Sequence, residues 1–320
     1  MKVMSFNDYK WHVIVNPNAL SARCKIYSKT VAQKLEELKI SHTKHIADKC
    51  NAGIDIVKNL CQQGEKYFIA VGGDGTVNEV VNGVFQSGVP TEEIYIAVIP
   101  LGTGNDWTHT HQYPSTYVKT MDSLNQAFFI KHDVGLVQTV INQQVASQRY
   151  FINIAGFGFD ASIASGVNET KSKVFSKTVY LLTLLRVLFT HKAQKIKIET
   201  EKTSFSENIF TLAVGICQYN GNGMRQLPMA NPVDGILDTA IIKDISPFKV
   251  IRNVNRLYSG SHIKALKDKI IVLNSNTVEI TAEPYVLGEV EGELLQKGDY
   301  RISILPRSLN MMSFNKDYVD

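Results

Sequence analysis

The first third of the 320-residue chain alternates short apolar runs with stretches whose apolar residues recur at helical spacing. The apolar runs predict buried strands. Such strands are expected at 11–17, 67–71 and 94–100, and a weaker strand is expected around 42–46. The helical spacing predicts helices at 24–38, 52–64 and 76–86, with Gly64 as the C-cap of the second. Strands and helices in alternation indicate a parallel, doubly wound α/β sheet.

From about Lys131 onward the pattern becomes one of strands separated by turn residues, with clear period-2 alternation over 277–283. One helical stretch, 178–192, interrupts the strands. We therefore expect a mainly antiparallel second domain, a β-sandwich. The expected division is 1–130 plus the tail 312–320 for the α/β domain, and 131–311 for the sandwich.

Composition and charge limit the classes of function. The chain is 44% hydrophobic and 20% charged, which is typical of a globular protein. A net charge of +4 permits anionic ligands or membrane surfaces but lacks the strong basic bias of a nucleic-acid binder. The four cysteines show no C-x-x-C spacing, so reduced thiols in a cytoplasmic protein are expected. No apolar run reaches the 18 residues of a membrane span, and no signal peptide is evident.

A glycine-rich turn follows the strand at 67–71, with the sequence Gly72-Gly73-Asp74-Gly75. Thr76 and Glu79 have the spacing of a capping box, which predicts that the next helix begins here. The free N–H groups and partial positive charge of a helix start suit a phosphate chain. The turn matches neither a Walker A loop nor the G-x-G-x-x-G fingerprint.

The next strand ends in a second turn of the same kind, PLGTGNDW at 100–107. Carboxyl ends of neighbouring parallel strands meet at one edge of a sheet, so Asp74 and Asp106 are expected to face one site. Phosphates alone would repel these carboxylates, whereas Mg²⁺ between them makes them metal ligands or orienting groups. A lone GGDG turn is often only a helix entry, and the second turn is what favours a nucleotide site.

The paired motifs GGDGTVNEVVNG and PLGTGND resemble the catalytic domain shared by diacylglycerol kinases, sphingosine and ceramide kinases, and the bacterial soluble lipid kinases. The resemblance extends over nearly the whole chain and is greatest to the bacterial soluble diacylglycerol kinase-like proteins. It implies that ATP lies with Mg²⁺ between an α/β domain and a β-sandwich. The implied reaction transfers the γ-phosphate to a lipid hydroxyl, with diacylglycerol giving phosphatidic acid.

The resemblance also implies roles for individual residues of the first domain. Asp74 and Asp106 would hold the catalytic Mg²⁺. Nucleotide contacts are implied for Asn16, Pro17, Asn18, Gly72, Gly73, Asp74, Gly75, Thr76, Asn78, Glu79, Gly102, Thr103, Gly104 and Asn105. The family's first loop normally carries a glycine, which is absent from NPNAL at 16–20.

In the second domain, AGFGFDASIA at 155–164 resembles the family's glycine-rich turn that ends in an acid. The resemblance further implies a structural Mg²⁺ held by the Asp234 carboxylate and the carbonyls of Asn231 and Ile236. Without the resemblance, Val233-Asp234-Gly235 would be interpreted as a simple β-turn. Glu293 occupies the position of the proposed general base. Glu291 stands where the family usually has Asp, so the sequence leaves its role open.

Residues 171–197 contain seven basic residues and no acidic one around an apolar core. This pattern predicts either a buried helix that covers the sheet, which we favour, or an interfacial helix at the inner face of a membrane. The pair His109 and His111 is expected in a surface loop rather than at a metal. A homodimer is left open, and no nucleic-acid partner is expected.

Two other functions compete with the lipid kinase. An NAD kinase also uses a GGDGT-like turn, although its second element differs from PLGTGNDW. The Glu291 departure and the glycine-free loop also permit a catalytically weak, nucleotide-binding regulatory protein.

Overall fold

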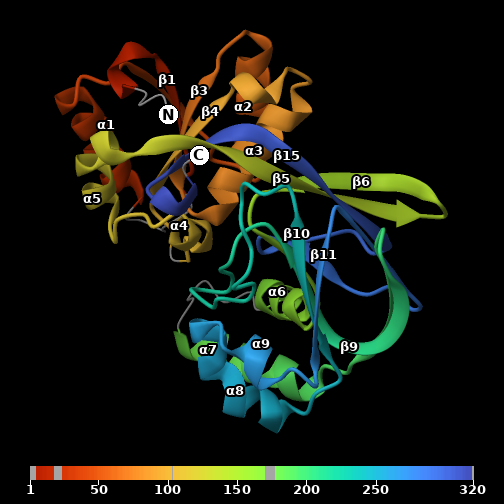
Figure 1. Ribbon diagram of the computed structural model, residues 1–320. Coiled ribbons are helices and arrows are strands. Elements are labelled where there is room, and N and C mark those ends of the chain that lie inside the picture. Colours follow the sequence, from red (N-terminus) through yellow and green to blue (C-terminus); the bar gives the residue numbers. More distant parts are fainter. Residues whose placement is uncertain (1–4, 18–23, 103, 170–176, 319–320) are drawn as a thin grey trace.

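The computed structural model describes residues 5–17, 24–102, 104–169 and 177–318 (Figure 1). An α/β unit forms one end of the molecule. Its parallel strands pair in the order β2-β1-β3-β4. Their bounds are β1 Trp11–Val15, β2 His42–Ile46, β3 Tyr67–Gly72 and β4 Tyr95–Pro100. The longer helices are α1 Cys24–Glu37, α2 Ala52–Gln62 and α3 Asp74–Gln86. Shorter ones are α4 Asp106–Thr110, α5 Tyr117–Asp122, η1 Phe6–Asp8, η3 Thr91–Glu93 and η4 Leu124–Gln126. The doubly wound α/β prediction is confirmed.

Both faces of this sheet are covered, as the continuous apolar strands predicted. On β1, the buried Ile14 side chain belongs to the core that α2 and α3 cover. Its neighbours Val13 and Val15 belong to the core on the opposite face, together with Val31 and Leu35 of α1. Successive side chains of a strand point to opposite faces, so a fully apolar strand requires two such layers.

The second unit is built from antiparallel strands, which confirms the β-sandwich prediction. Its strands are β5 Phe128–Ile141, β6 Gln144–Phe151, β7 Ile154–Gly158, β8 Gln194–Glu199, β9 Ser204–Gly215, β10 Leu237–Lys243, β11 Ile270–Ser275, β12 Thr277–Ala282, β13 Gly288–Val290, β14 Glu293–Leu294 and β15 Asp299–Ser313. A short helix, η5 Lys316–Tyr318, follows the last strand.

Two long strands join the units. β15 pairs antiparallel with β5 along almost its whole length, and its end pairs parallel with β4 through Asn310 and Met311. In Figure 1, β5 and β15 run side by side from the α/β unit into the sandwich. The division expected after residue 130 falls inside β5, and the one after residue 311 falls inside β15.

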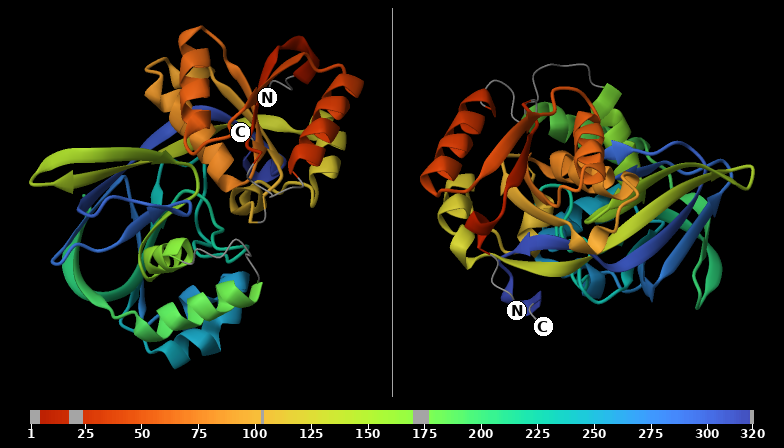
Figure 2. Two further views of the ribbon diagram at one scale, coloured as in Figure 1. Left: turned by 180° about the vertical axis from the view of Figure 1, so that it is seen from behind. Right: turned by 90° about the horizontal axis from the view of Figure 1, so that it is seen from above.

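The expectation of a single helix in the second unit is wrong. Four helices are described there: α6 Phe159–Glu169, α7 Lys177–Thr190, α8 Pro247–Ser259 and α9 His262–Ala265. α6 follows β7 directly, within the segment that the sequence suggested was a glycine-rich turn. Figures 1 and 2 show α7, α8 and α9 gathered at the end of the sandwich farthest from the α/β unit.

Local signals for α8 were present in the sequence. The Ser246 side chain accepts a hydrogen bond from the Lys249 backbone N–H, Pro247 occupies the first turn, and Gly260 follows the last turn with φ of 72°. None of the helices in the described ranges is long and apolar enough to cross a bilayer.

Candidate active site between the glycine turns and the β13–β14 hairpin

The two glycine turns touch at the ends of β3 and β4. Gly72 pairs with Pro100, and the Leu101 N–H donates to the Gly72 carbonyl at 2.8 Å. A Cβ atom at Gly102 would lie 2.5 Å from the Cα of Gly73, so a side chain there would collide with backbone. Asn105 closes the second turn, because its Oδ1 accepts from the Gly102 N–H at 3.0 Å.

The capping box predicted at Thr76 and Glu79 is wrong. α3 begins at Asp74, with Gly73 as its N-cap. The Glu79 carboxylate accepts instead from the N–H groups of Asn51 (3.1 Å) and Gly53 (2.9 Å), at the start of α2. Glu79 therefore stabilises the start of a neighbouring helix, which no local pattern can indicate. Burial still raises its pKa.

Asp74 and Asp106 face a common point. Asp74 accepts from the N–H groups of Asp106 (3.2 Å) and Trp107 (3.3 Å), so it holds the start of α4. A Cβ atom at Gly104 would lie 3.3 Å from Asp74 Oδ2 and 3.6 Å from Asp106 Oδ2. Burial, followed by the charge of Asp106, raises the pKa of Asp74. Two converging, mutually repelling carboxylates are a donor set that fits a hard divalent cation such as Mg²⁺.

The loop before β10 also reaches this point. The Asp106 carboxylate accepts from the backbone N–H groups of Asn222 at 2.9 Å and Gly223 at 2.6 Å. Both donors belong to the second unit. Asp106 thereby connects the second glycine turn to the sandwich.

Glu291 forms another connection between the units. It sits with φ of 51° in the turn between β13 and β14. Its Oε1 accepts from the N–H groups of Ile152 and Asn153, both at 2.8 Å, and its Oε2 accepts from Asn78 Nδ2 of α3 at 2.7 Å. Burial raises the pKa of Glu291 to about 7. The hairpin is thus fixed against the helix that follows the first glycine turn.

Glu293 lies two residues farther on and is exposed at the start of β14. Its charge contributes to the raised pKa values of both Glu79 and Glu289, which places its carboxylate within electrostatic reach of these two groups. In the part of the chain that the structure describes, we observe no hydrogen bond to the Glu293 side chain. The carboxylate is therefore accessible to an incoming ligand.

A further carboxylate was missed by the sequence analysis. Glu289 is only 4% exposed, and its Oε2 accepts from the Gly292 N–H at 2.6 Å. Burial raises its pKa to about 8, with smaller contributions from Asp160, Glu291 and Glu293. Burial likewise raises the pKa of Asp160 to about 6. Glu289, Glu291 and Glu293 alternate in the sequence, and this row of acidic residues could have drawn attention to Glu289.

The remaining predicted nucleotide residues are distributed around the turns. The Asn16 N–H donates to the Val71 carbonyl at 3.4 Å, which places the end of β1 beside β3. Gly75 is exposed, and a Cβ atom there would meet no other atom within 4 Å. Pro17 is partly buried at the end of the described segment. Asn18 and Thr103 lie outside the described residues.

The residues expected at a structural Mg²⁺ lie in one turn before β10. Asp234 is exposed, and its Oδ1 accepts from the Ile236 N–H at 3.0 Å. Asn231 Oδ1 accepts from the Val233 N–H at 3.3 Å. The carboxylates of Asp133 and Asp238 lie within electrostatic reach of Asp234. Burial, with a smaller contribution from the charge of Asp234, raises the pKa of each to about 6. These carboxylates give the turn a negative electrostatic environment.

Comparisons with known proteins agree with this architecture. Residues 10–137 match the model of the diacylglycerol kinase catalytic domain. Residues 153–313 match the model of the YegS C-terminal NAD kinase beta sandwich-like domain. The chain therefore belongs to the diacylglycerol kinase-like family of lipid kinases.

The chain is also similar to a diacylglycerol kinase of Bacillus subtilis strain 168, with 26% identity over 283 residues that cover 88% of each chain. Its fold is similar to the crystal structure of a diacylglycerol kinase from Bacillus anthracis, with a TM-score of 0.70, 18% identity, and coverage of 97% of this chain and 98% of that one. Yeast NADH kinase complexed with NADH shares the fold more distantly, with a TM-score of 0.52, 11% identity, and coverage of 95% and 82%.

Proposed function

We propose that this protein is an ATP-dependent lipid kinase that transfers the γ-phosphate of ATP to the hydroxyl of a lipid, with diacylglycerol as the expected acceptor. The observation that carries the choice of a lipid is an apolar cavity in the second unit, whose polar end adjoins the carboxylates of the β13–β14 hairpin.

The phosphate side of the proposed reaction rests on the two glycine turns. The start of α3 offers backbone N–H groups, and exposed Gly75 leaves room for an anion to approach them. Asp74 and Asp106 would hold Mg²⁺, which neutralises charge on the phosphate chain when bound. The protein's contribution is positioning, since Asp106 and Glu291 fix the turns relative to the sandwich.

The proposed acceptor site is a cavity of about 120 Å³. Apolar side chains dominate its wall, including Ile163 of α6, Leu188 of α7, Phe210 of β9, and Val250 and Leu257 of α8. Such a lining suits a segment of an acyl chain, since the cavity is smaller than the roughly 300 Å³ of an ordinary ligand pocket, and offers little to a soluble, charged acceptor.

The polar end of the cavity leads toward the hairpin. Asp160 lines the cavity and accepts a hydrogen bond from Gln226 Nε2 at 2.6 Å. The Asp160 carboxylate is also electrostatically coupled to Glu289, which is coupled in turn to Glu291 and Glu293. A lipid whose chain occupies the cavity would thus present its head group to this row. We propose that Glu293 accepts the proton of the lipid hydroxyl and that Glu291 positions the hairpin.

The route by which a lipid would enter is the α7–α8 face, which we define by its exposed side chains Leu182, Phe189, Phe248, Ile251 and Tyr258. The Phe189 and Phe248 rings lie 5.9 Å apart, so the face is continuous between the two helices. Exposed Arg186 and Arg252 lie on these same helices. Apolar residues beside basic ones suit an anionic membrane surface.

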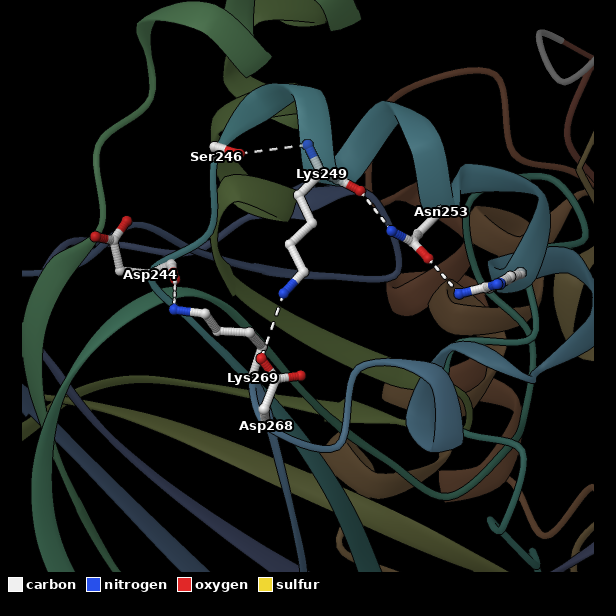
Figure 3. A network of polar contacts seen from close by, with 7 residues as sticks. Asp244, Ser246, Lys249, Asn253, Asp268 and Lys269 are labelled. Carbon is white, nitrogen blue, oxygen red and sulfur yellow. Dashed lines mark hydrogen bonds and ion pairs between the residues drawn. The ribbon is translucent and has the colours of Figure 1, made fainter.

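Polar contacts lie along α8 and the segments beside it (Figure 3). Figure 3 shows Lys249 paired with Asp268 (3.3 Å) and Lys269 donating to the Asp244 carbonyl (3.0 Å). Asn253 donates to the Lys249 carbonyl at 2.8 Å on the inward side of the helix. Of these contacts, the Lys249–Asp268 ion pair connects α8 to the segment before β11.

Vesicle co-sedimentation tests the α7–α8 face. The double variant Phe248→Ser/Ile251→Ser should bind anionic vesicles more weakly than the unmodified protein. Val145→Ser, which removes an exposed apolar side chain from β6, is the control. Equal vesicle binding by all three proteins would contradict the proposed membrane approach.

Steady-state kinetics test the general base. Glu293→Gln should lower kcat by about 10²–10⁴-fold, the usual contribution of a general base, and leave ATP–Mg²⁺ affinity unchanged. Glu207→Gln, a change at an exposed position of β9, is the control. A parallel loss of ATP affinity and kcat would instead indicate a structural role for Glu293.

A soluble acceptor such as NAD is the second candidate, because yeast NADH kinase shares the fold. The third is a nucleotide-binding regulatory protein without turnover. Phosphorylation of NAD in preference to lipid acceptors would support the former, and ATP–Mg²⁺ binding without transfer to any hydroxylated lipid would support the latter. We also keep a structural Mg²⁺ at Asn231, Asp234 and Ile236 as a proposal, supported by the negative charge around that turn.

A further inference from the structure

Three side chains with metal-ligating atoms meet in the interior, outside the proposed active site. His111 follows α4, His132 lies in β5, and Cys217 follows β9. All three residues are 0% exposed, and one ligand atom from each lies within 4.8 Å of the other two. The expectation that His111 belongs to a surface loop is therefore wrong.

Both imidazole rings are oriented as metal-bound histidines are. Each directs Nε2 toward the Cys217 sulfur, at 3.8 Å in both cases. Each directs Nδ1 outward to an oxygen: the Asp133 carbonyl for His132, and the Ser313 hydroxyl at 3.2 Å for His111. An outer hydrogen bond of this kind fixes the ring and leaves the other nitrogen free to ligate.

Hydrogen bonds explain the cluster only in part. Cys217 Sγ lies 3.2 Å from the Ile152 carbonyl, which can only accept, so a thiol proton donated there serves neither imidazole. His132 donates through Nδ1, so its Nε2 carries a lone pair that faces the sulfur. The Trp107 indole N–H reaches this nitrogen at 3.3 Å, a long hydrogen bond that a bound metal would displace. A cation between the three atoms would take the His132 Nε2 lone pair in place of the Trp107 N–H and would bind the sulfur as a thiolate.

We propose that His111 Nε2, His132 Nε2 and the Cys217 thiolate bind one Zn²⁺ ion. With ordinary Zn–S and Zn–N bond lengths, a sulfur–nitrogen separation of 3.8 Å corresponds to an angle of about 120° at the metal. The two imidazole nitrogens, which lie within 4.8 Å of each other, must come to within about 4.2 Å when both bind the ion. Cysteine and histidine are the ligands that zinc prefers. Binding releases the thiol proton of Cys217 to solvent.

The site would connect the two units directly behind the candidate active site. His111 comes from the α/β unit and Cys217 from the sandwich. The ring of Trp107, the residue after Asp106, lies 4.0 Å from the His111 ring, centroid to centroid. Zinc would therefore stabilise the arrangement that holds Asp106 against the loop at 222–223.

Metal titration of the full-length chain tests the proposal. After chelation, the protein should take up one equivalent of Zn²⁺. Co²⁺ in its place should give the absorption of a cobalt–thiolate bond. Cys217→Ser should abolish that absorption and lower zinc affinity by more than the roughly 10- to 100-fold that loss of an outer hydrogen-bond partner costs. Cys61→Ser, at another buried cysteine, is the control and should behave as the unmodified protein.

Circular dichroism of each variant establishes that it is folded. If Cys217→Ser does not fold, His111→Gln replaces it, and the cobalt spectrum should then retain the thiolate absorption with altered ligand-field bands. Reconstituted protein that takes up no zinc, or a cobalt spectrum unchanged by both variants, would overturn the proposal. Preferential uptake of copper with exclusion of zinc would overturn the assignment of the metal.

Discussion

Replacing Glu289 by Gln isolates the cost of a buried carboxylate in the β13–β14 hairpin. Gln has the same length and keeps an oxygen that can accept from the Gly292 N–H, now 2.6 Å from Glu289 Oε2. The variant removes only the ability to ionise. It therefore reproduces the protonated state of Glu289 at every pH.

The magnitude follows from the shift in pKa. Burial raises the pKa of Glu289 from 4.5 to about 8, so ionisation is disfavoured in the folded state. The protonated carboxyl is fully tolerated below pH 4.5. Stability is then lost as the pH rises from 4.5 to 8, by about 1.4 kcal/mol per pH unit and about 5 kcal/mol in total.

Equilibrium urea unfolding at pH 5 and pH 8.5 measures this effect. We expect the free energies of unfolding of Glu289→Gln and the unmodified protein to agree within about 1 kcal/mol at pH 5. At pH 8.5 the variant should be more stable by several kcal/mol, up to about 5. Glu207→Gln, at an exposed position, should show no such pH-dependent difference. If the difference between Glu289→Gln and the unmodified protein is the same at both pH values, the carboxylate is not buried as described.

Three further substitutions test the region around the first glycine turn. Gly75→Ala should leave the thermal midpoint unchanged or slightly raised, because the added Cβ meets no atom within 4 Å. The same variant should weaken ATP binding measured by calorimetry, and an unchanged affinity would contradict phosphate contact at Gly75. Gly83→Ala should destabilise the fold by about 1–3 kcal/mol in urea unfolding, since its Cβ would lie 2.7 Å from the Ile54 carbonyl oxygen. Glu79→Ala leaves two N–H groups at the start of α2 without their partner and should cost about 2–4 kcal/mol; a loss below 1 kcal/mol would show that water replaces the carboxylate.

The sequence predicted the parallel sheet well because β1, β3 and β4 are bounded apolar runs and because the apolar residues of α1, α2 and α3 recur at helical spacing; the polar edge strand β2 gave only a weak signal. It also predicted that Asp74 and Asp106 converge, since both follow neighbouring strands. The error at Thr76 and Glu79 has a tertiary cause: the Glu79 carboxylate is used by α2, which lies more than 20 residues earlier. Local capping patterns carry no information on such a competitor.

Other features depend on long-range register. Cys217 meets His111 and His132 because β5 and the segment after β9 are brought together by the sheet, across separations of 106 and 85 residues. Glu291 reaches Asn78 across 213 residues. No spacing in the sequence encodes these contacts. The helix α8, in contrast, was predictable from Ser246 and Gly260 at its ends.

The most direct test of the proposed lipid kinase is the fate of the γ-phosphate. The protein would be incubated with γ-labelled ATP, Mg²⁺ and a total lipid extract, and the labelled products would be identified by mass spectrometry. The account predicts label in a phosphorylated lipid, with phosphatidic acid from diacylglycerol as the expected product, and loss of that label in Glu293→Gln. Binding of ATP–Mg²⁺ without label in any lipid, or transfer to NAD in preference to every lipid, would contradict it.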